Sequence, residues 1–82
     1  MLLSEIFDKV KMENAASKLK YGLWSSIPEP EQKEAIEGEM YEWQVAYFSS
    51  DVHGEHGEVA ELIDLINTAC RRIQFLTGEP DA

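Results

Sequence analysis

The chain has 82 residues and a formal net charge of −9, with 7 lysines and arginines against 16 aspartates and glutamates. This length fits one domain, predicted to span residues 1–82, which as a monomer would bury too little surface to be more than marginally stable. Hydrophobic residues make up 44% of the chain, which excludes a disordered acidic tail. The acidic balance provides no basic field for phosphate backbones and argues against binding of DNA or RNA.

The first predicted helix covers about residues 4–21, with Ser4 as its N-cap and Gly22 as its C-terminal stop. Its apolar side chains form two stripes on nearly opposite sides of the helix. One stripe contains Leu3, Ile6, Phe7 and Val10, and the other contains Met12, Ala15, Ala16, Leu19 and Leu23. A helix with two apolar faces needs neighbours on both sides, which favours a partner chain. A bend near Glu13 and Asn14 would also explain the pattern.

The second predicted helix covers about residues 30–48. Two prolines, Pro28 and Pro30, keep the preceding segment extended, and Pro30 suits the first helical turn. The apolar positions of this helix recur at helical spacing. They are Ile36, Met40, Trp43 and Tyr47.

The third predicted helix covers about residues 58–76 and follows a glycine-containing loop over residues 49–57. Gly78 and Pro80 would end it. Its apolar stripe contains Val59, Leu62, Ile63, Ile66, Ala69, Cys70 and Ile73. No segment alternates apolar and polar residues as a strand does, so the predicted fold class is all-α.

Three helices with this much apolar surface require packing partners. The simplest solution is a three-helix antiparallel unit that completes a helical bundle by homo-oligomerisation, as a dimer or a tetramer. The single cysteine, Cys70, excludes an internal disulfide framework and is expected to be an inert core thiol. We expect a cytoplasmic protein without membrane contact, since no apolar run is long enough to span a bilayer and the N-terminus lacks signal-peptide features.

Two acidic pairs are the most informative feature of the sequence. Glu39 and Glu42 are three residues apart, and Glu61 and Asp64 repeat this spacing. Residues at i and i+3 lie on one side of a helix, so two antiparallel helices can direct four carboxylates to one point. Hard oxygen ligands of this kind suit Mg²⁺ or Mn²⁺.

The alternative interpretation of these acids is a solvated helix face. Glu61 and Asp64 lie roughly opposite the apolar stripe of their helix, as exposed residues do. Glu39 differs, because it lies in the apolar sector of its helix between Ala35 and Trp43. A carboxylate at such a position is costly unless it is paired or coordinated.

The run from Glu39 to Glu42, followed after a gap by Glu61 to Asp64, resembles the ExxE…ExxD signature of the MazG-like all-α nucleoside triphosphate pyrophosphohydrolases. The resemblance implies hydrolysis of a nucleoside triphosphate, expected to be a deoxynucleotide, to monophosphate and pyrophosphate, in nucleotide-pool cleansing. It also implies that these four acids are catalytic and bind Mg²⁺. Members of the family often have a further Glu where this chain has Gly38.

A triphosphate substrate also needs cationic donors and a platform for the base. Asn67 and Arg71 follow Asp64 on one side of the third helix and are candidate substrate-binding residues. The alternative for both is a solvated face. Three further candidate substrate-binding residues, two lysines and a tryptophan, cluster around Gly22. The alternative interpretation is that the lysines are solvent-exposed and the tryptophan packs in the core. They are Lys18, Lys20 and Trp24.

The loop sequence His53-Gly54-Glu55-His56-Gly57 contains side chains that can bind Zn²⁺ or Ni²⁺. Because four ligands are usual for structural zinc and no cysteine is nearby, a flexible acidic loop that can act as a flap is the preferred interpretation. Two alternatives to an enzyme stay open for the whole chain. One is an acidic helical interaction or inhibitor module, which would need no Mg²⁺, and the other is an inactive relative of the same fold.

Overall fold

The computed structural model describes residues 1–79, and all regular structure within them is helical. The elements are helix α1 (Leu3–Tyr21), a 3₁₀ turn η1 (Trp24–Ser26), helix α2 (Glu29–Ser49) and helix α3 (Glu58–Leu76). The predicted all-α class is therefore confirmed for the described residues, with three helices close to their predicted bounds. Pro80, which was predicted to help end α3, lies outside them. Among residues 1–79, no helix combines the length and apolar character needed to cross a membrane.

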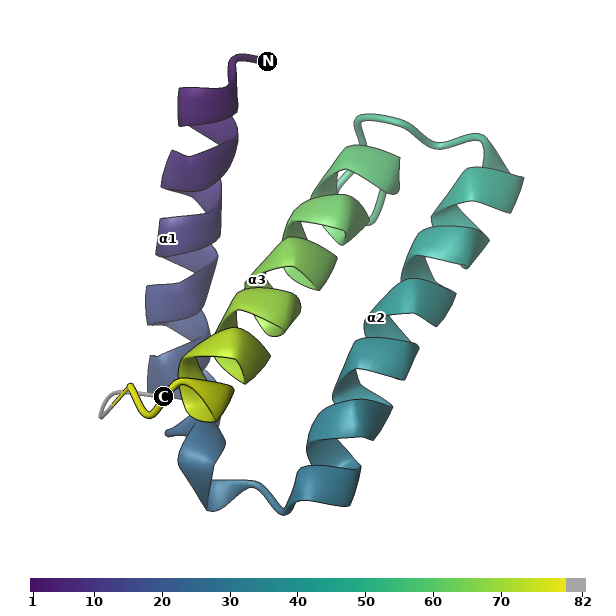
Figure 1. The fold of residues 1–82 in the computed structure, drawn as a ribbon. Helices are drawn as coiled ribbons and strands as arrows, with labels where there is room; N and C mark the ends of the chain where they lie inside the picture. Colours follow the sequence, from purple (N-terminus) through teal and green to yellow (C-terminus); the bar gives the residue numbers. More distant parts are fainter. Residues whose placement is uncertain (80–82) are drawn as a thin grey trace.

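Helix α3 is the central element and packs against both α1 and α2 (Figure 1). The chain runs in opposite directions along α2 and α3, and α1 crosses α3 in the same general direction (Figure 1). The Trp43 indole Nε1 on α2 donates a hydrogen bond of 3.2 Å to Glu58 Oε1 at the start of α3. This bond joins the C-terminal half of α2 to the N-terminus of α3.

The ends of α1 follow the sequence signals only in part. Its N-cap is Leu2, not Ser4, so the prediction of a serine cap is wrong. Glu5 supplies the reason, because its carboxylate accepts a hydrogen bond of 3.4 Å from the Leu2 N–H and serves an amide that the helix leaves free. Gly22 ends the helix as predicted, with a φ of 80° that favours glycine.

Gln32 holds the connection between α1 and α2 in place. Its side chain is fully buried, and its Nε2 donates to the carbonyls of Trp24 at 3.3 Å and Ile27 at 2.9 Å. Its Oε1 accepts a bond of 2.6 Å from Arg72 Nη1 on α3. One glutamine therefore links η1, α2 and α3. The 3₁₀ turn η1 also packs against α3.

The apolar core of the single chain is small. Among the described residues, the buried hydrophobic side chains are Val10, Trp24, Ala46 and Ile63. Many residues of the apolar stripes, which the sequence predicts to need packing partners, are exposed on the single chain. They include Leu3, Phe7, Met12, Leu19, Met40, Tyr47, Leu62, Ile66 and Ile73. Helix α3 turns a largely polar face toward the interior.

Candidate active site

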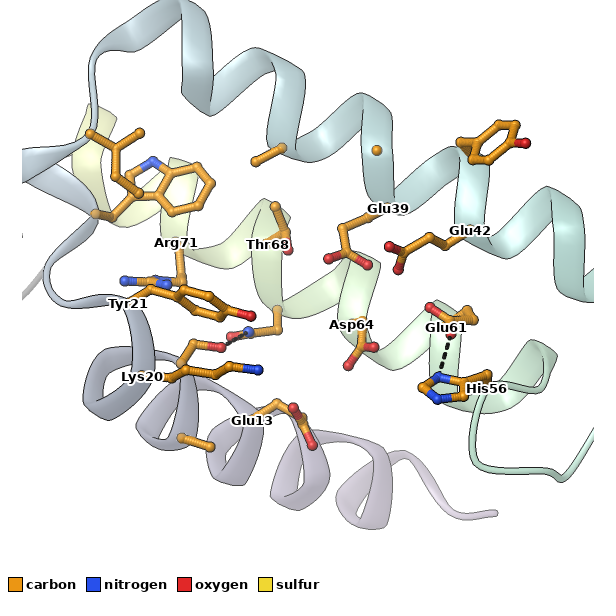
Figure 2. Close-up of a pocket in the computed structure, with 18 of the residues that line it drawn as sticks. Glu13, Lys20, Tyr21, Glu39, Glu42, His56, Glu61, Asp64, Thr68 and Arg71 are labelled. Atoms are coloured by element: carbon orange, nitrogen blue, oxygen red, sulfur yellow. Dashed lines mark hydrogen bonds and ion pairs between the residues drawn. The ribbon is translucent and has the colours of Figure 1, made fainter.

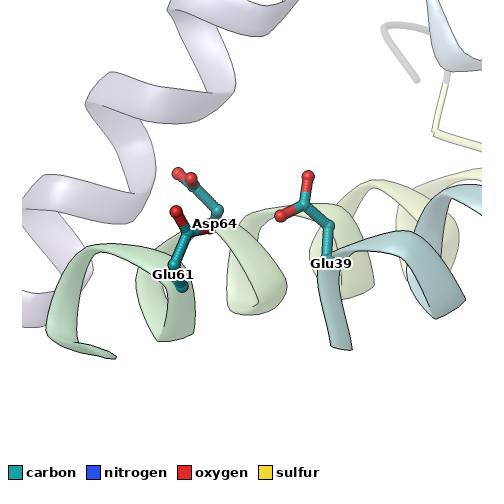
Figure 3. Close-up of side chains that lie close together, drawn as sticks. All are labelled: Glu39, Glu61 and Asp64. Atoms are coloured by element: carbon teal, nitrogen blue, oxygen red, sulfur yellow. The ribbon is translucent and has the colours of Figure 1, made fainter. Parts of the chain in front are cut away.

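Three carboxylates from two helices converge on one point (Figure 3). Glu39 comes from α2, and Glu61 and Asp64 come from successive turns of α3. One oxygen from each lies within 4.8 Å of the other two. Because α3 runs beside α2, the i, i+3 pair on one helix faces the single glutamate on the other. We call these three residues the acidic trio.

The fourth predicted acid, Glu42, lies beside the acidic trio without belonging to this close group (Figure 2). It is one turn further along α2 than Glu39 and more exposed. The structure thus brings three of the four predicted acids into ligand range of one another and places the fourth, Glu42, within hydrogen-bonding reach of two of them, Glu39 and Glu61.

The residues of the acidic trio are more buried than residues on an ordinary solvent-exposed helix face. Glu61 is only 5% exposed, so its interpretation as a solvated residue is wrong. Glu39 and Asp64 are half-buried. An oxygen of Glu39 and one of Glu61, both Oε2, are buried without a hydrogen-bond partner. Unpartnered buried oxygens are costly, and a bound cation is one way to satisfy them.

Crowding of the carboxylates raises their pKa values. Burial, followed by repulsion from Glu42, Asp64 and Glu61, raises the pKa of Glu39 from 4.5 to about 7. Burial is also the main cause of the raised pKa of Glu61, with Glu42 as its strongest carboxylate neighbour. The trio therefore concentrates negative charge, which favours a cation.

Burial likewise raises the pKa of Asp64, and here the largest repulsion comes from Glu13 on α1. Glu13 was not predicted as a site residue. Its contribution shows that all three helices, not only α2 and α3, shape the potential at the acidic trio.

The acidic trio lies at one end of a cleft of about 960 Å³. At the other end lie Lys20, Tyr21 and Arg71 (Figure 2). The cleft therefore changes along its length from strongly negative to positive and aromatic. A ligand that carries a cation at one end and anionic and planar groups beyond it matches this order of charges.

Arg71 is a buried cation, contrary to the alternative of a solvated face. It is 3% exposed, its Nη2 donates a bond of 2.7 Å to the Gly22 carbonyl, and its guanidinium lies 5.1 Å from the centroid of a Trp24 ring. Burial lowers its pKa. Its Nε has no hydrogen-bond partner, so this buried cation retains an unused donor beside the cleft.

Asn67 is buried in the same way, at 5% exposed. Its Nδ2 donates to Ser17 Oγ at 3.1 Å, whereas its Oδ1 has no partner. Both Asn67 and Ser17 line the cleft. Asn67 Oδ1 is thus another buried, unpartnered polar atom on a residue that lines the cleft and is not acidic.

The other predicted substrate-binding residues differ in position. Lys20 and Trp24 line the cleft, but Lys18 does not. Trp24 is 3% exposed and packs in the core, as its alternative held. The sequence reasoning missed several lining residues. The spacing of three of them on α1, at i, i+4 and i+8, is a signal that points to one helix face. They are Glu13, Ser17 and Tyr21, together with Thr68 on α3.

The two histidines of the loop between α2 and α3 have different surroundings. His56 lines the acidic end of the cleft, with Nδ1 3.5 Å from Glu61 Oε1 (Figure 2). His53 does not line this cleft. Cys70 is a half-buried free thiol on α3.

No family model, curated protein or solved structure matches this chain. Function is therefore inferred from the residues of the cleft. Chemically, they can hold a divalent cation through oxygen ligands and present cationic and aromatic groups to the anionic and planar parts of the same ligand.

Proposed function

We propose that the chain is a Mg²⁺-dependent nucleoside triphosphate pyrophosphohydrolase of the MazG-like kind, which acts on deoxynucleotides and cleanses the nucleotide pool. The observation that carries the proposal is the acidic trio, whose ligand oxygens lie within 4.8 Å of one another at the end of a cleft with a cationic opposite end. The buried, unpartnered oxygens of Glu39 and Glu61 support it, because they suit a hard cation.

In this proposal, Glu39, Glu61 and Asp64 hold the cation. Bound Mg²⁺, or Mn²⁺ in its place, supplies neutralisation of phosphate charge and promotes ionisation of water. Glu42 lies in the cleft outside the trio, so it is the carboxylate left to orient a water for attack at the α-phosphorus. Phosphoryl transfer of this type asks the protein mainly for positioning and electrostatics.

The other end of the cleft would bind the rest of the nucleotide. Lys20 is an exposed cation that lines the cleft and can meet phosphate oxygens. Asn67 and Arg71 have buried polar atoms without partners and can contact phosphate or sugar. Because Trp24 is buried, the exposed ring of Tyr21 is the better platform for the base.

We also propose that the chain completes a helical bundle by self-association, as a dimer or a tetramer. The small buried core and the many exposed apolar side chains of α1 and α3 support this arrangement. Sedimentation equilibrium at micromolar concentration should give a mass above that of one chain. Leu19→Glu, at a side chain that is 91% exposed, should lower that mass if the α1 face is the interface. A monomeric wild-type protein would refute self-association.

The activity is tested by a hydrolysis screen. Purified protein is mixed with the standard ribo- and deoxynucleoside triphosphates and dUTP, first with Mg²⁺ and then with EDTA, and monophosphate and pyrophosphate are quantified separately. Glu61→Gln should abolish turnover, whereas Glu34→Gln, at an exposed glutamate of α2, should preserve it. Absence of turnover in a folded wild-type sample would refute the enzyme. An interaction module or an inactive relative, consistent with Gly38, would then replace it.

A further inference from the structure

The loop between α2 and α3 is held by a dense set of hydrogen bonds. The Gly54 N–H donates to Asp51 Oδ1 at 2.9 Å, and the Gly57 N–H donates to the Gly54 carbonyl at 2.9 Å. The N–H of Glu58, the first residue of α3, donates to the Asp51 carbonyl at 2.9 Å. These bonds fold the loop back onto the start of α3 and fix the direction in which its side chains leave.

Gly57 makes this closed geometry possible. A Cβ at this position would lie 2.8 Å from the Gly54 nitrogen and 2.9 Å from the Val52 carbonyl oxygen, and both are backbone atoms that cannot rotate away. Gly57 is also the N-cap of α3, so the tight turn and the helix start share one residue. The neighbouring residue in the loop, His56, is consequently held beside the first turn of α3.

This placement puts the His56 imidazole against one oxygen of the acidic trio (Figure 2). His56 Nδ1 is 3.5 Å from Glu61 Oε1, whereas Oε2 of the same carboxylate is buried without a partner. The Glu61 side chain is 6% exposed and that of His56 is 85% exposed. An exposed imidazole thus reaches in from the loop to contact a buried carboxylate.

We infer that His56 is a positioning residue for the cation site, an inference that rests on the proposed binding of a divalent cation by the acidic trio. With a proton on Nδ1, the His56 imidazole faces Oε1 of Glu61 at 3.5 Å and restrains the carboxylate, which leaves Oε2 available to the cation. Groups that hold a metal-binding carboxylate from outside typically contribute about 10–100-fold to metal affinity. Asn67, which is 5% exposed and lines the same cleft, provides an independent observation. Its buried Oδ1 has no hydrogen-bond partner and is available to a ligand there.

The test uses Mn²⁺ as the probe, titrated into the full chain and followed by the electron paramagnetic resonance signal of the free ion. His56→Leu should weaken Mn²⁺ binding about 10–100-fold. His56→Gln retains an N–H donor and should recover part of the affinity. His53→Leu is the matched control, since His53 is on the same loop and does not line the cleft, and it should bind like wild type. Thermal unfolding in EDTA should be the same for all four proteins.

The outcomes separate this inference from the proposed function. If wild type binds no Mn²⁺, the cation site and the role of His56 both fail. If wild type binds and His56→Leu binds equally well, only the role of His56 fails. Equal weakening by His53→Leu, or a loss of EDTA-state stability in His56→Leu, would show a structural role and refute positioning. If the Mn²⁺ pattern holds without nucleotide turnover, pyrophosphohydrolase activity fails and the inference stands.

Discussion

The raised pKa of Glu39 predicts that Glu39→Gln stabilises the metal-free protein at alkaline pH. The carboxyl group titrates near 4.5 in an unfolded chain and at about 7 in the folded one, because of burial and of its acidic neighbours. Between these values the folded state holds a proton that the unfolded state has lost. The free energy of unfolding therefore falls as pH rises through this window, and the penalty is complete above the folded pKa.

The magnitude follows from the same two values. They differ by about 2.5, which corresponds to about 3 kcal/mol at 1.36 kcal/mol per pKa unit. Glu39 is only half-buried, so solvent screens much of this effect, and we expect about 1 kcal/mol. For a domain of this size that is about 4–8 °C in Tm. Glutamine keeps the shape of the side chain and removes the charge.

The assay is thermal denaturation in EDTA at pH 5 and pH 8 at one fixed protein concentration. Wild type should be less stable at pH 8 relative to Glu39→Gln, and the two should converge at pH 5. Glu34→Gln, on the exposed side of α2, controls for the general loss of one negative charge. The reasoning is refuted if Glu39→Gln has the pH dependence of wild type, or if Glu34→Gln reproduces its gain.

Three further predictions concern the cation, the buried Gln32 and the buried Arg71. Mg²⁺ at 100 times its Kd should stabilise wild type at pH 8 by about 2.7 kcal/mol, and an equal rise in Tm for Glu61→Gln would contradict binding at the acidic trio. Gln32→Leu leaves the carbonyls of Trp24 and Ile27 without their donor, so urea unfolding should show a free energy of unfolding lower by about 2–4 kcal/mol. An unchanged urea midpoint would refute the role of Gln32 in holding the connection between α1 and α2. Arg71→Met removes the bond to the Gly22 carbonyl and the contact with Trp24. It should lower the free energy of unfolding by about 2–3 kcal/mol, and wild-type stability in this variant would refute the role of Arg71 in fixing the end of α1.

The helix bounds could be predicted because the chain marks them with local signals. Gly22 ends α1 with a positive φ, and Pro30 lies in the first turn of α2. Each signal acts through the conformation of one residue and needs no knowledge of tertiary structure. Ser4 failed as a cap because the Glu5 carboxylate performs that task from inside the helix.

The orientation of α3 could not be predicted in the same way. Its sequence is strongly amphipathic, and the usual rule turns the apolar side inward. In the structure, Glu61, Asn67 and Arg71 face the interior, whereas Leu62, Ile66 and Ile73 are exposed. The polar groups that meet this buried face, such as Ser17 and the Gly22 carbonyl, come from residues far away in the sequence. The spacing of apolar residues shows how apolar each helix face is, but it does not show which polar groups from other elements will contact the polar face.

The site could be predicted where a charged residue interrupts the apolar sector of its helix. Glu39 interrupts the apolar sector of α2, and the structure places it in the acidic trio. Glu13 and Tyr21 break no pattern on α1 and enter the cleft only through the crossing of α1 over α3. A single sequence therefore identified the carboxylates of the two adjacent helices and missed the contribution of the third helix.

The orientation of α3, with its polar side inward and much of its apolar side exposed, bears on both the proposed site and the proposed self-association. A central helix that turns its polar side chains inward brings the three carboxylates of the acidic trio together within one chain. The same orientation leaves Ile66 and Ile73 outside, where only another surface can cover them. Self-association would then supply stability that the small core lacks. A dissociating variant such as Leu19→Glu should accordingly lose thermal stability first, and should retain Mn²⁺ binding at temperatures where it stays folded.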